Sequence, residues 1–163
     1  MIFVTVGTYE VPFDRLLRAV ERLPAREQLV VQHGPSAIRP PGATCFDFLP
    51  YERVVAHVRD ARVVVSHAGV GSVLVALANG KRPVVVPRLR RFGEVVDDHQ
   101  LAFARRLRRE GLVDLVEDPD CLPAALAAAG ANGSAPAGRG GSLAGELRRY
   151  LEATVGVRAV GLG

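Results

Sequence analysis

The chain contains no tryptophan, and aromatic residues make up only 6% of its 163 residues. Proteins that bind nucleic acids commonly combine basic patches with aromatic side chains and a recognisable reader motif. No such motif accompanies the arginines here, although the formal net charge is +4 and the isoelectric point is near 9.7. We therefore expect no nucleic-acid partner. The basicity comes from arginine, since Lys81 is the single lysine.

Cysteine is also scarce, because Cys45 and Cys121 are far apart and form no C-x-x-C pair. This pattern predicts a reduced compartment and neither a metal cluster nor any other metal site. Long apolar runs are absent too, and none approaches the roughly 20 residues that a membrane-spanning helix needs. Residues 1–7 lack the charged region of a signal peptide. The sequence thus predicts a cytoplasmic protein whose membrane contact is peripheral or made through a partner.

Apolar residues are abundant, at 48% of the chain, which is enough for the core of one globular domain. Short buried-strand patterns alternate with amphipathic helical patterns. Strands are expected at residues 2–6, 28–32, 44–48, 61–66, 83–87 and 112–116. Helices are expected at residues 13–23, 51–58, 72–79 and 99–110, and around Pro123 with Asp120 as its cap. Such alternation favours an α/β fold with a Rossmann-like, mostly parallel sheet and helices on both faces.

The composition changes sharply near residue 130. Residues 130–142 are almost entirely glycine, alanine, serine, asparagine and proline, so they are expected to form a flexible linker. Residues 143–163 carry Leu143, Leu147 and Leu151 at helical spacing, which predicts an amphipathic helix and a tail. The expected Rossmann-like domain therefore covers residues 1–129.

A glycine-rich turn, Ser-His-Ala-Gly-Val-Gly-Ser at residues 66–72, follows the apolar strand pattern and leads into a helix expected to begin near Ser72. Free backbone N–H groups and the helix dipole favour an anion at such a turn. A plain tight turn, with His67 as a buried structural histidine, is the alternative. A second polar helix start, at residues 97–100, should face the same edge of a parallel sheet, where open α/β folds bind ligands. The turn is therefore a candidate diphosphate site.

Four motifs occur along the chain: Val-Thr-Val-Gly-Thr at 4–8, Pro-Phe-Asp-Arg-Leu at 12–16, the 66–72 turn, and Phe-Gly-Glu at 92–94 with Asp-Asp-His-Gln at 97–100. Over roughly residues 1–128 they resemble the C-terminal domain of glycosyltransferase family 28. Within that family the chain is similar to the small donor-binding subunits of two-component polysaccharide and dolichol-linked N-acetylglucosamine transferases. The resemblance implies the C-terminal half of a GT-B enzyme that uses a UDP-sugar and needs no metal or other cofactor.

The resemblance also implies a hexosyltransferase that is active only with a partner. The acceptor-binding half would be a separate, membrane-anchored subunit presenting a lipid-linked acceptor for polysaccharide synthesis. This chain would then be cytoplasmic and peripheral at the inner face of the plasma membrane. A non-catalytic nucleotide- or phosphate-binding module is the alternative, because no residue here is a convincing general base. A dinucleotide-dependent oxidoreductase fits poorly, since its glycine turn would follow the first strand and not the fourth.

The resemblance assigns roles to individual residues. The diphosphate would be bound by His67 and Ser72 and by backbone N–H groups near Gly69, Val70 and Gly71. The donor sugar would contact His99 and Gln100, whose alternative role is an ordinary helix start capped by Asp97 or Asp98. Gly7 and Thr8 would face the cleft between subunits, and the uracil would lie near Phe48, Leu49 and Pro50.

Two further features of the sequence bear on the site. Many relatives carry a ribose-binding glutamate three residues after Ser72, where this chain has Val75. Valine cannot bind a hydroxyl, so either another group binds the ribose or the nucleotide specificity differs. Four arginines crowd the segment between the two polar helix starts, and we expect them to border the same cleft and face phosphate or anionic lipid. These arginines are Arg82, Arg88, Arg90 and Arg91.

Overall fold

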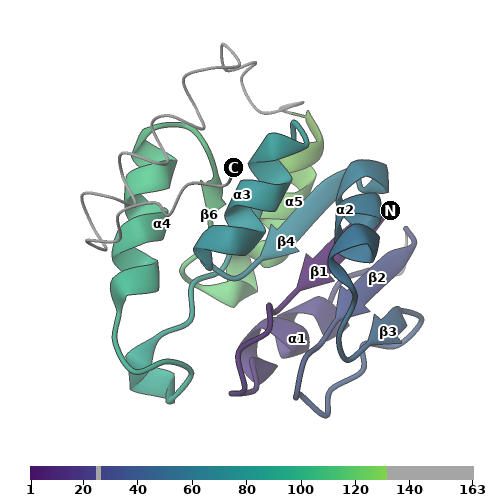
Figure 1. Ribbon diagram of the computed structural model, residues 1–163, viewed down its shortest axis with the longest axis horizontal. Helices are drawn as coiled ribbons and strands as arrows, with labels where there is room; N and C mark the ends of the chain where they lie inside the picture. The colour runs from purple at the N-terminus through teal and green to yellow at the C-terminus, as the bar shows by residue number, and fades with distance from the viewer. Residues whose placement is uncertain (25–26, 132–163) are drawn as a thin grey trace, which may run out of the picture.

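The structure, a computed structural model, describes residues 1–24 and 27–131. Its centre is a six-stranded sheet in the order β3-β2-β1-β4-β5-β6, and all neighbouring strands are parallel (Figure 1). The strands are β1 Ile2–Thr5, β2 Leu29–Gln32, β3 Thr44–Phe46, β4 Val63–Ser66, β5 Val84–Val85 and β6 Asp114–Leu115. The helices are α1 Asp14–Glu21, α2 Tyr51–Asp60, α3 Val70–Ala78, α4 His99–Arg109 and α5 Leu122–Ala131, with 3₁₀ turns η1 Arg90–Phe92 and η2 Pro119–Cys121.

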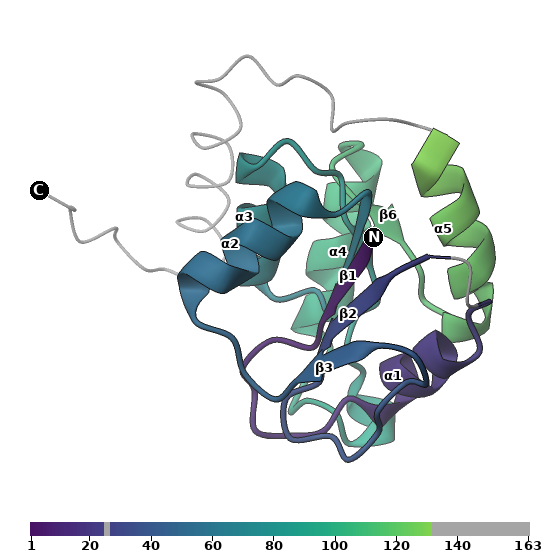
Figure 2. The same ribbon diagram turned by 90° about the vertical axis from the view of Figure 1, so that its right-hand side faces the viewer.

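Helices cover both faces of the sheet, as the alternation of patterns predicts. Helices α1 and α5 lie on one face, and α2, α3 and α4 lie on the other (Figure 2). Successive strand residues point to opposite faces, so a strand buried on both sides must be apolar throughout. In β1, Ile2 and Val4 pack toward α1 and α5, whereas Phe3 packs toward α2 and α3. The continuous apolar runs in the sequence therefore correspond to central strands.

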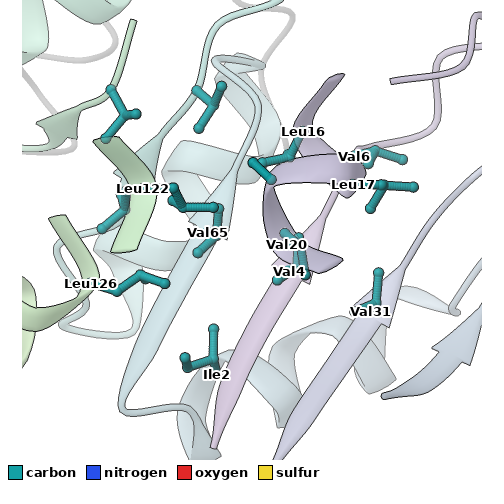
Figure 3. Close-up of a cluster of buried hydrophobic side chains, with 14 of the residues drawn as sticks. Ile2, Val4, Val6, Leu16, Leu17, Val20, Val31, Val65, Leu122 and Leu126 are labelled. Carbon is teal, nitrogen blue, oxygen red and sulfur yellow. The ribbon is translucent and has the colours of Figure 1, made fainter. Parts of the chain in front are cut away.

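The larger core cluster lies between the sheet and helices α1 and α5. Figure 3 shows α1 contributing Leu16, Leu17 and Val20, which meet valines of the central strands. Helix α5 adds Leu122 and Leu126, which pack on the same face of the sheet as α1. Apolar residues spaced three and four apart give α1 this buried stripe. The cluster holds the carboxyl ends of the strands in a fixed plane beneath the site described below.

Most strands and helices begin or end one or two residues from their predicted bounds, and three of the differences concern helix caps or the domain boundary. Helix α3 begins at Val70, two residues before Ser72, because Gly69 already serves as its N-cap. The cap expected at Asp120 is wrong: the carboxylate of Asp118 accepts the Asp120 N–H at 3.0 Å, and the Asp120 side chain pairs instead with Arg22, the residue after α1. Helix α5 continues to Ala131, whereas the expected linker 130–142 begins at residue 130. The rest of that linker and the 143–163 segment lie outside the described residues.

Candidate functional site

Three polar side chains lie side by side where the central strands end. The parallel register pairs Thr5 of β1 with Gln32 of β2 and with Ser66 of β4. All three are buried, on the face of the sheet that α2 and α3 cover. From β1 the strand order continues to β2 and β3 on one side and to β4, β5 and β6 on the other. This is the topological switch point, where open α/β sheets bind ligands.

A pocket of about 430 Å³ opens at this switch point. It contains eight residues singled out in the sequence: Gly7, Thr8, Leu49, His67, Gly69, Gly71, Ser72 and Val75. Residues that the sequence reasoning missed complete its lining, namely Thr5, Gln32, Tyr51 and Val54. The pocket thus lies over the ends of β1, β2 and β4, and between the first turns of α2 and α3.

The first turn of α3 provides the anion-binding features expected of the glycine turn. The first N–H groups of any helix lack intrahelical partners, and here no side chain caps them. A Cβ added to Gly71 would meet nothing within 4 Å, so this glycine leaves open space above the backbone. Together with the helix dipole, these N–H groups favour a bound anion.

Gly69 serves a different purpose from Gly71, because the ring of His67 occupies the space beside it. A Cβ on Gly69 would collide with Nε2 of His67 and lie 2.8 Å from Cδ2. A Cβ on Gly7 would lie 2.7 Å from the same Nε2, and Gly7 also has a left-handed φ of +76°. The imidazole therefore packs closely against two glycine backbones, and a side chain at either position would displace it.

His67 is a neutral imidazole at physiological pH. Burial, and after it the positive charge of Arg88, lower its pKa to about 4, although a hydrogen bond with the backbone of Thr5 acts in the opposite direction. Its Nδ1 is buried without a hydrogen-bond partner among the described residues. A neutral ring can donate through one nitrogen and accept through the other. The arrangement suits a fixed, uncharged contact to a ligand better than a proton shuttle.

The low pKa of His67 predicts a pH-dependent stability. Between pH 7 and pH 5 the unfolded histidine gains a proton that the folded one does not, so the free energy of unfolding should fall by about 2 kcal/mol from this group alone. The stability is present above pH 6.5 and is lost as the pH falls toward 4. Urea unfolding followed by circular dichroism should show this loss in the wild type and in the exposed control His99→Gln, but not in His67→Gln. An equal loss in all three proteins would contradict the assignment.

Other residues with predicted roles lie apart from the pocket lining. Gln100 is buried, and its Oε1 accepts the backbone N–H of Arg88 at 3.3 Å. His99 is exposed; its ring pairs with the carboxylate of Asp97, which also accepts the His99 N–H at 3.0 Å. Contact with the donor sugar therefore stays a prediction for His99 and Gln100. The lining likewise omits Val70, Phe48 and Pro50.

The expectation for the arginine-rich segment is wrong for Arg88, which is fully buried. Its guanidinium donates to the carbonyl oxygens of Val6, Val11, Pro12 and Glu94 at 2.9 to 3.3 Å. It also lies 4.6 Å from the centre of an aromatic ring of the same loop region. Arg88 thus joins the β1–α1 loop to the β5–α4 loop. The arginine-rich segment resembles a solvated surface in the sequence, but Arg88 within it is a buried, structural cation.

The other arginines of that segment also lie apart from the pocket. Arg82 pairs with Asp114 at 2.6 Å, while Arg90 and Arg91 are exposed. Arg15 of α1 forms a two-pronged pair with Glu94, with both N–O distances at 2.9 Å. The Arg15–Glu94 pair holds the β5–α4 loop against α1. None of these arginines lines the pocket, so they supply no positive charge to its lining.

The pocket holds no carboxylate among its lining residues. Within residues 1–24 and 27–131, no three or more His, Cys, Asp or Glu side chains gather where a metal ion would be held. Over the same residues, none of the helices has the length and apolar character to cross a bilayer. The chemistry available in the pocket is therefore hydrogen bonding from fixed neutral groups and a helix N-terminus.

Comparison with known families gives one match over most of the chain. The model of the family described as "Glycosyltransferase family 28 C-terminal domain" matches residues 1–140. The human protein "UDP-N-acetylglucosamine transferase subunit ALG13" is 32% identical over 123 residues, covering 68% of this chain and 10% of the human protein. The protein of the same name from Yarrowia lipolytica is 48% identical over 62 residues, covering 38% of this chain and 30% of the yeast protein. The chain thus spans only a minor part of these curated relatives.

Two solved glycosyltransferase structures share the fold. The glycotransferase of kitacinnamycin superposes with a TM-score of 0.59 at 22% identity, over 93% of this chain and 39% of that chain. CalG4, the calicheamicin glycosyltransferase, gives a TM-score of 0.59 at 17% identity, over 94% of this chain and 38% of that chain. At such identities the likeness concerns the fold alone. It confirms the predicted fold class, a Rossmann-like half of a GT-B architecture.

Proposed function

Because this chain belongs to the glycosyltransferase family 28 C-terminal domain family, we propose that it is the UDP-sugar-binding subunit of a two-component glycosyltransferase. The observation that carries the proposal is the pocket at the switch point. It combines an uncapped helix N-terminus, a glycine that leaves open space and a fixed neutral histidine. Groups of this kind can bind a diphosphate without a metal ion.

The groups in the pocket would act on the departing nucleotide. When a sugar leaves UDP, negative charge builds on the diphosphate, and fixed donors that stabilise this charge lower the barrier. Backbone N–H groups of Gly71 and Ser72 would supply such donors, and the open space at Gly71 would let a phosphate approach. His67 would add a hydrogen bond from a ring that packs closely against two glycines.

The general base would come from outside this pocket. No carboxylate lines the pocket, and a histidine with a pKa of about 4 is a weak base at neutral pH. A partner that binds the acceptor would therefore complete the active site. We propose a membrane-anchored partner that presents a lipid-linked acceptor, with this chain peripheral at the cytoplasmic face through that partner. The names of the relatives make N-acetylglucosamine the first donor sugar to test.

Exposed apolar side chains support a partner at this edge of the sheet. The large hydrophobic side chains that the described residues expose all follow the carboxyl ends of strands, near the pocket edge or in the β5–α4 loop. Contiguous exposed apolar surface commonly marks an interaction site. The residues are Tyr9, Phe48, Tyr51, Phe92 and Val96, with exposed fractions from 41% to 75%.

Reconstitution tests the proposal. Calorimetry should detect binding of UDP and UDP-N-acetylglucosamine to the isolated chain, which should transfer no sugar by itself. Co-expression with a membrane-anchored acceptor-binding subunit should give a complex that transfers sugar to a lipid-linked acceptor. Full turnover by the isolated chain, or failure to associate with any such subunit, would refute the split-enzyme proposal. Nucleotide binding without transfer in every such complex would favour the non-catalytic module.

A further inference from the structure

Gln32 is a buried polar residue for which the fold supplies a partner to only one of its two amide atoms. It ends β2, beside Thr5 of β1, and its side chain is 2% exposed. It nevertheless lines the pocket at the switch point. A polar side chain at the end of an otherwise apolar buried strand must find partners for both its amide nitrogen and its amide oxygen.

The hydrogen bond that Gln32 makes fixes the orientation of its amide. Nε2 donates to the carbonyl oxygen of Gly7 at 3.2 Å. A carbonyl oxygen only accepts, so the opposite amide orientation would place two acceptors against each other. Oε1 is therefore the atom left without a partner, and it has none among the described residues. Buried acceptors without a partner are few in folded proteins, so each one calls for an explanation.

A second unpartnered atom belongs to the same pocket. Nδ1 of His67 is buried and has no partner among the described residues either. Gln32 ends β2 and His67 follows β4, and both line the pocket together with Gly7, which lies against both of them. Two separate unsatisfied groups in one pocket indicate that a bound ligand completes the hydrogen bonding.

We propose that Oε1 of Gln32 accepts a hydrogen bond from a hydroxyl group of the bound sugar nucleotide; this inference rests on the proposed function. The diphosphate offers only acceptor oxygens at neutral pH, so it cannot satisfy Oε1. The hydroxyl groups of the ribose and of the transferred sugar can. Val75 lines the same pocket and offers no acceptor, which leaves Gln32 as a neutral acceptor for a hydroxyl. Gln32 would thereby select for hydroxyl-bearing nucleotides.

Calorimetry with four ligands tests this role: UDP, 2′,3′-dideoxy-UDP, UDP-N-acetylglucosamine and inorganic pyrophosphate. If a ribose hydroxyl is the donor, the wild type should prefer UDP to 2′,3′-dideoxy-UDP by about tenfold, and Gln32→Met should abolish that preference. If a hydroxyl of the transferred sugar is the donor, Gln32→Met should weaken only UDP-N-acetylglucosamine, again by about tenfold. Pyrophosphate affinity should not change. Gln28→Met, at the exposed residue preceding the same strand, is the matched control.

The contrary outcomes separate this inference from the proposed function. Equal weakening of all four ligands in Gln32→Met would mean that Gln32 acts only through Gly7, and no weakening would mean that it has no role in binding. Either result overturns the inference while wild-type UDP binding still supports the proposed function. If Gln32→Met does not fold, the wild-type affinities still test the inference. Equal wild-type affinities for UDP, 2′,3′-dideoxy-UDP and UDP-N-acetylglucosamine would overturn the inference and leave the proposed function standing. A wild type that binds no uridine nucleotide overturns both.

Discussion

Replacing Arg88 with methionine should lower the free energy of unfolding by about 3–5 kcal/mol. The side chain is fully buried and donates to four backbone carbonyls, those of Val6, Val11, Pro12 and Glu94. Backbone carbonyls cannot be removed by substitution, so methionine would leave all four without these donors, and the hydrogen bonds to Val6 and Glu94 are buried. Each buried carbonyl that loses its donor costs about 1 kcal/mol or more. Together these costs exceed the free energy gained because methionine buries no charge.

The measurement is urea unfolding followed by far-ultraviolet circular dichroism, because the chain has no tryptophan for fluorescence. Arg18→Met is the matched control, since Arg18 is an exposed arginine of α1 and its loss should change stability by less than about 0.5 kcal/mol. Arg88→Lys should fall between the wild type and Arg88→Met, because an ammonium group cannot span four carbonyls as a guanidinium does. Equal stability of Arg88→Met and Arg18→Met would contradict this account.

The same arginine sets the electrostatic environment of the site. Its positive charge is the second cause, after burial, that lowers the pKa of His67. Removing the charge in Arg88→Met should therefore raise that pKa above about 4, whereas Arg88→Lys should leave it low. The imidazole signals of His67 in a nuclear magnetic resonance titration report this directly. Arg88 thus links the loops around the pocket to the charge state of the histidine within it.

Local sequence patterns were sufficient to predict the fold and the place of the candidate pocket. Residues 2–4 of β1 and 63–65 of β4 form continuous apolar runs, which are typical of strands buried on both faces. The glycine turn and the alternation of strands with helices put the start of α3 at the carboxyl edge of a parallel sheet. These predictions depend on residues close in the sequence, so no tertiary contact was needed to make them.

The residues that the sequence reasoning misplaced depend on distant contacts. Arg88 appears in an arginine-rich segment that resembles a solvated surface, and only the meeting of two loops buries it. Gln32 ends an apolar strand, but its free acceptor is visible only once Gly7, from the loop after β1, lies beside it. The predicted role of Gly69, a backbone contact to the diphosphate, was also incomplete. The ring of His67, and not a phosphate, fills the space beside this glycine.

Gly69→Ala should damage both the fold and nucleotide binding, because the new methyl group would collide with the ring of His67. The ring also packs closely against Gly7, which limits how far it can move. Overpacking of this kind costs about 1–3 kcal/mol of stability. A displaced His67 would also lose the hydrogen bond proposed to the diphosphate, so UDP affinity should fall at least about tenfold. The backbone itself is not strained by alanine, because Gly69 has a φ of −76°.

Two comparisons isolate the cause. In a His67→Ala background the ring is gone, so Gly69→Ala should lose most of its cost in stability, and a double-mutant cycle of the free energies of unfolding measures that coupling. Gly71→Ala should behave oppositely. A methyl group there meets no protein atom and favours the helix by up to about 1 kcal/mol, yet it would occupy the open space proposed for the phosphate and weaken UDP binding. Additive free energies in the cycle would contradict the proposed collision with the ring of His67. Unchanged UDP affinity in both glycine variants would contradict the roles proposed for the ring and for the open space.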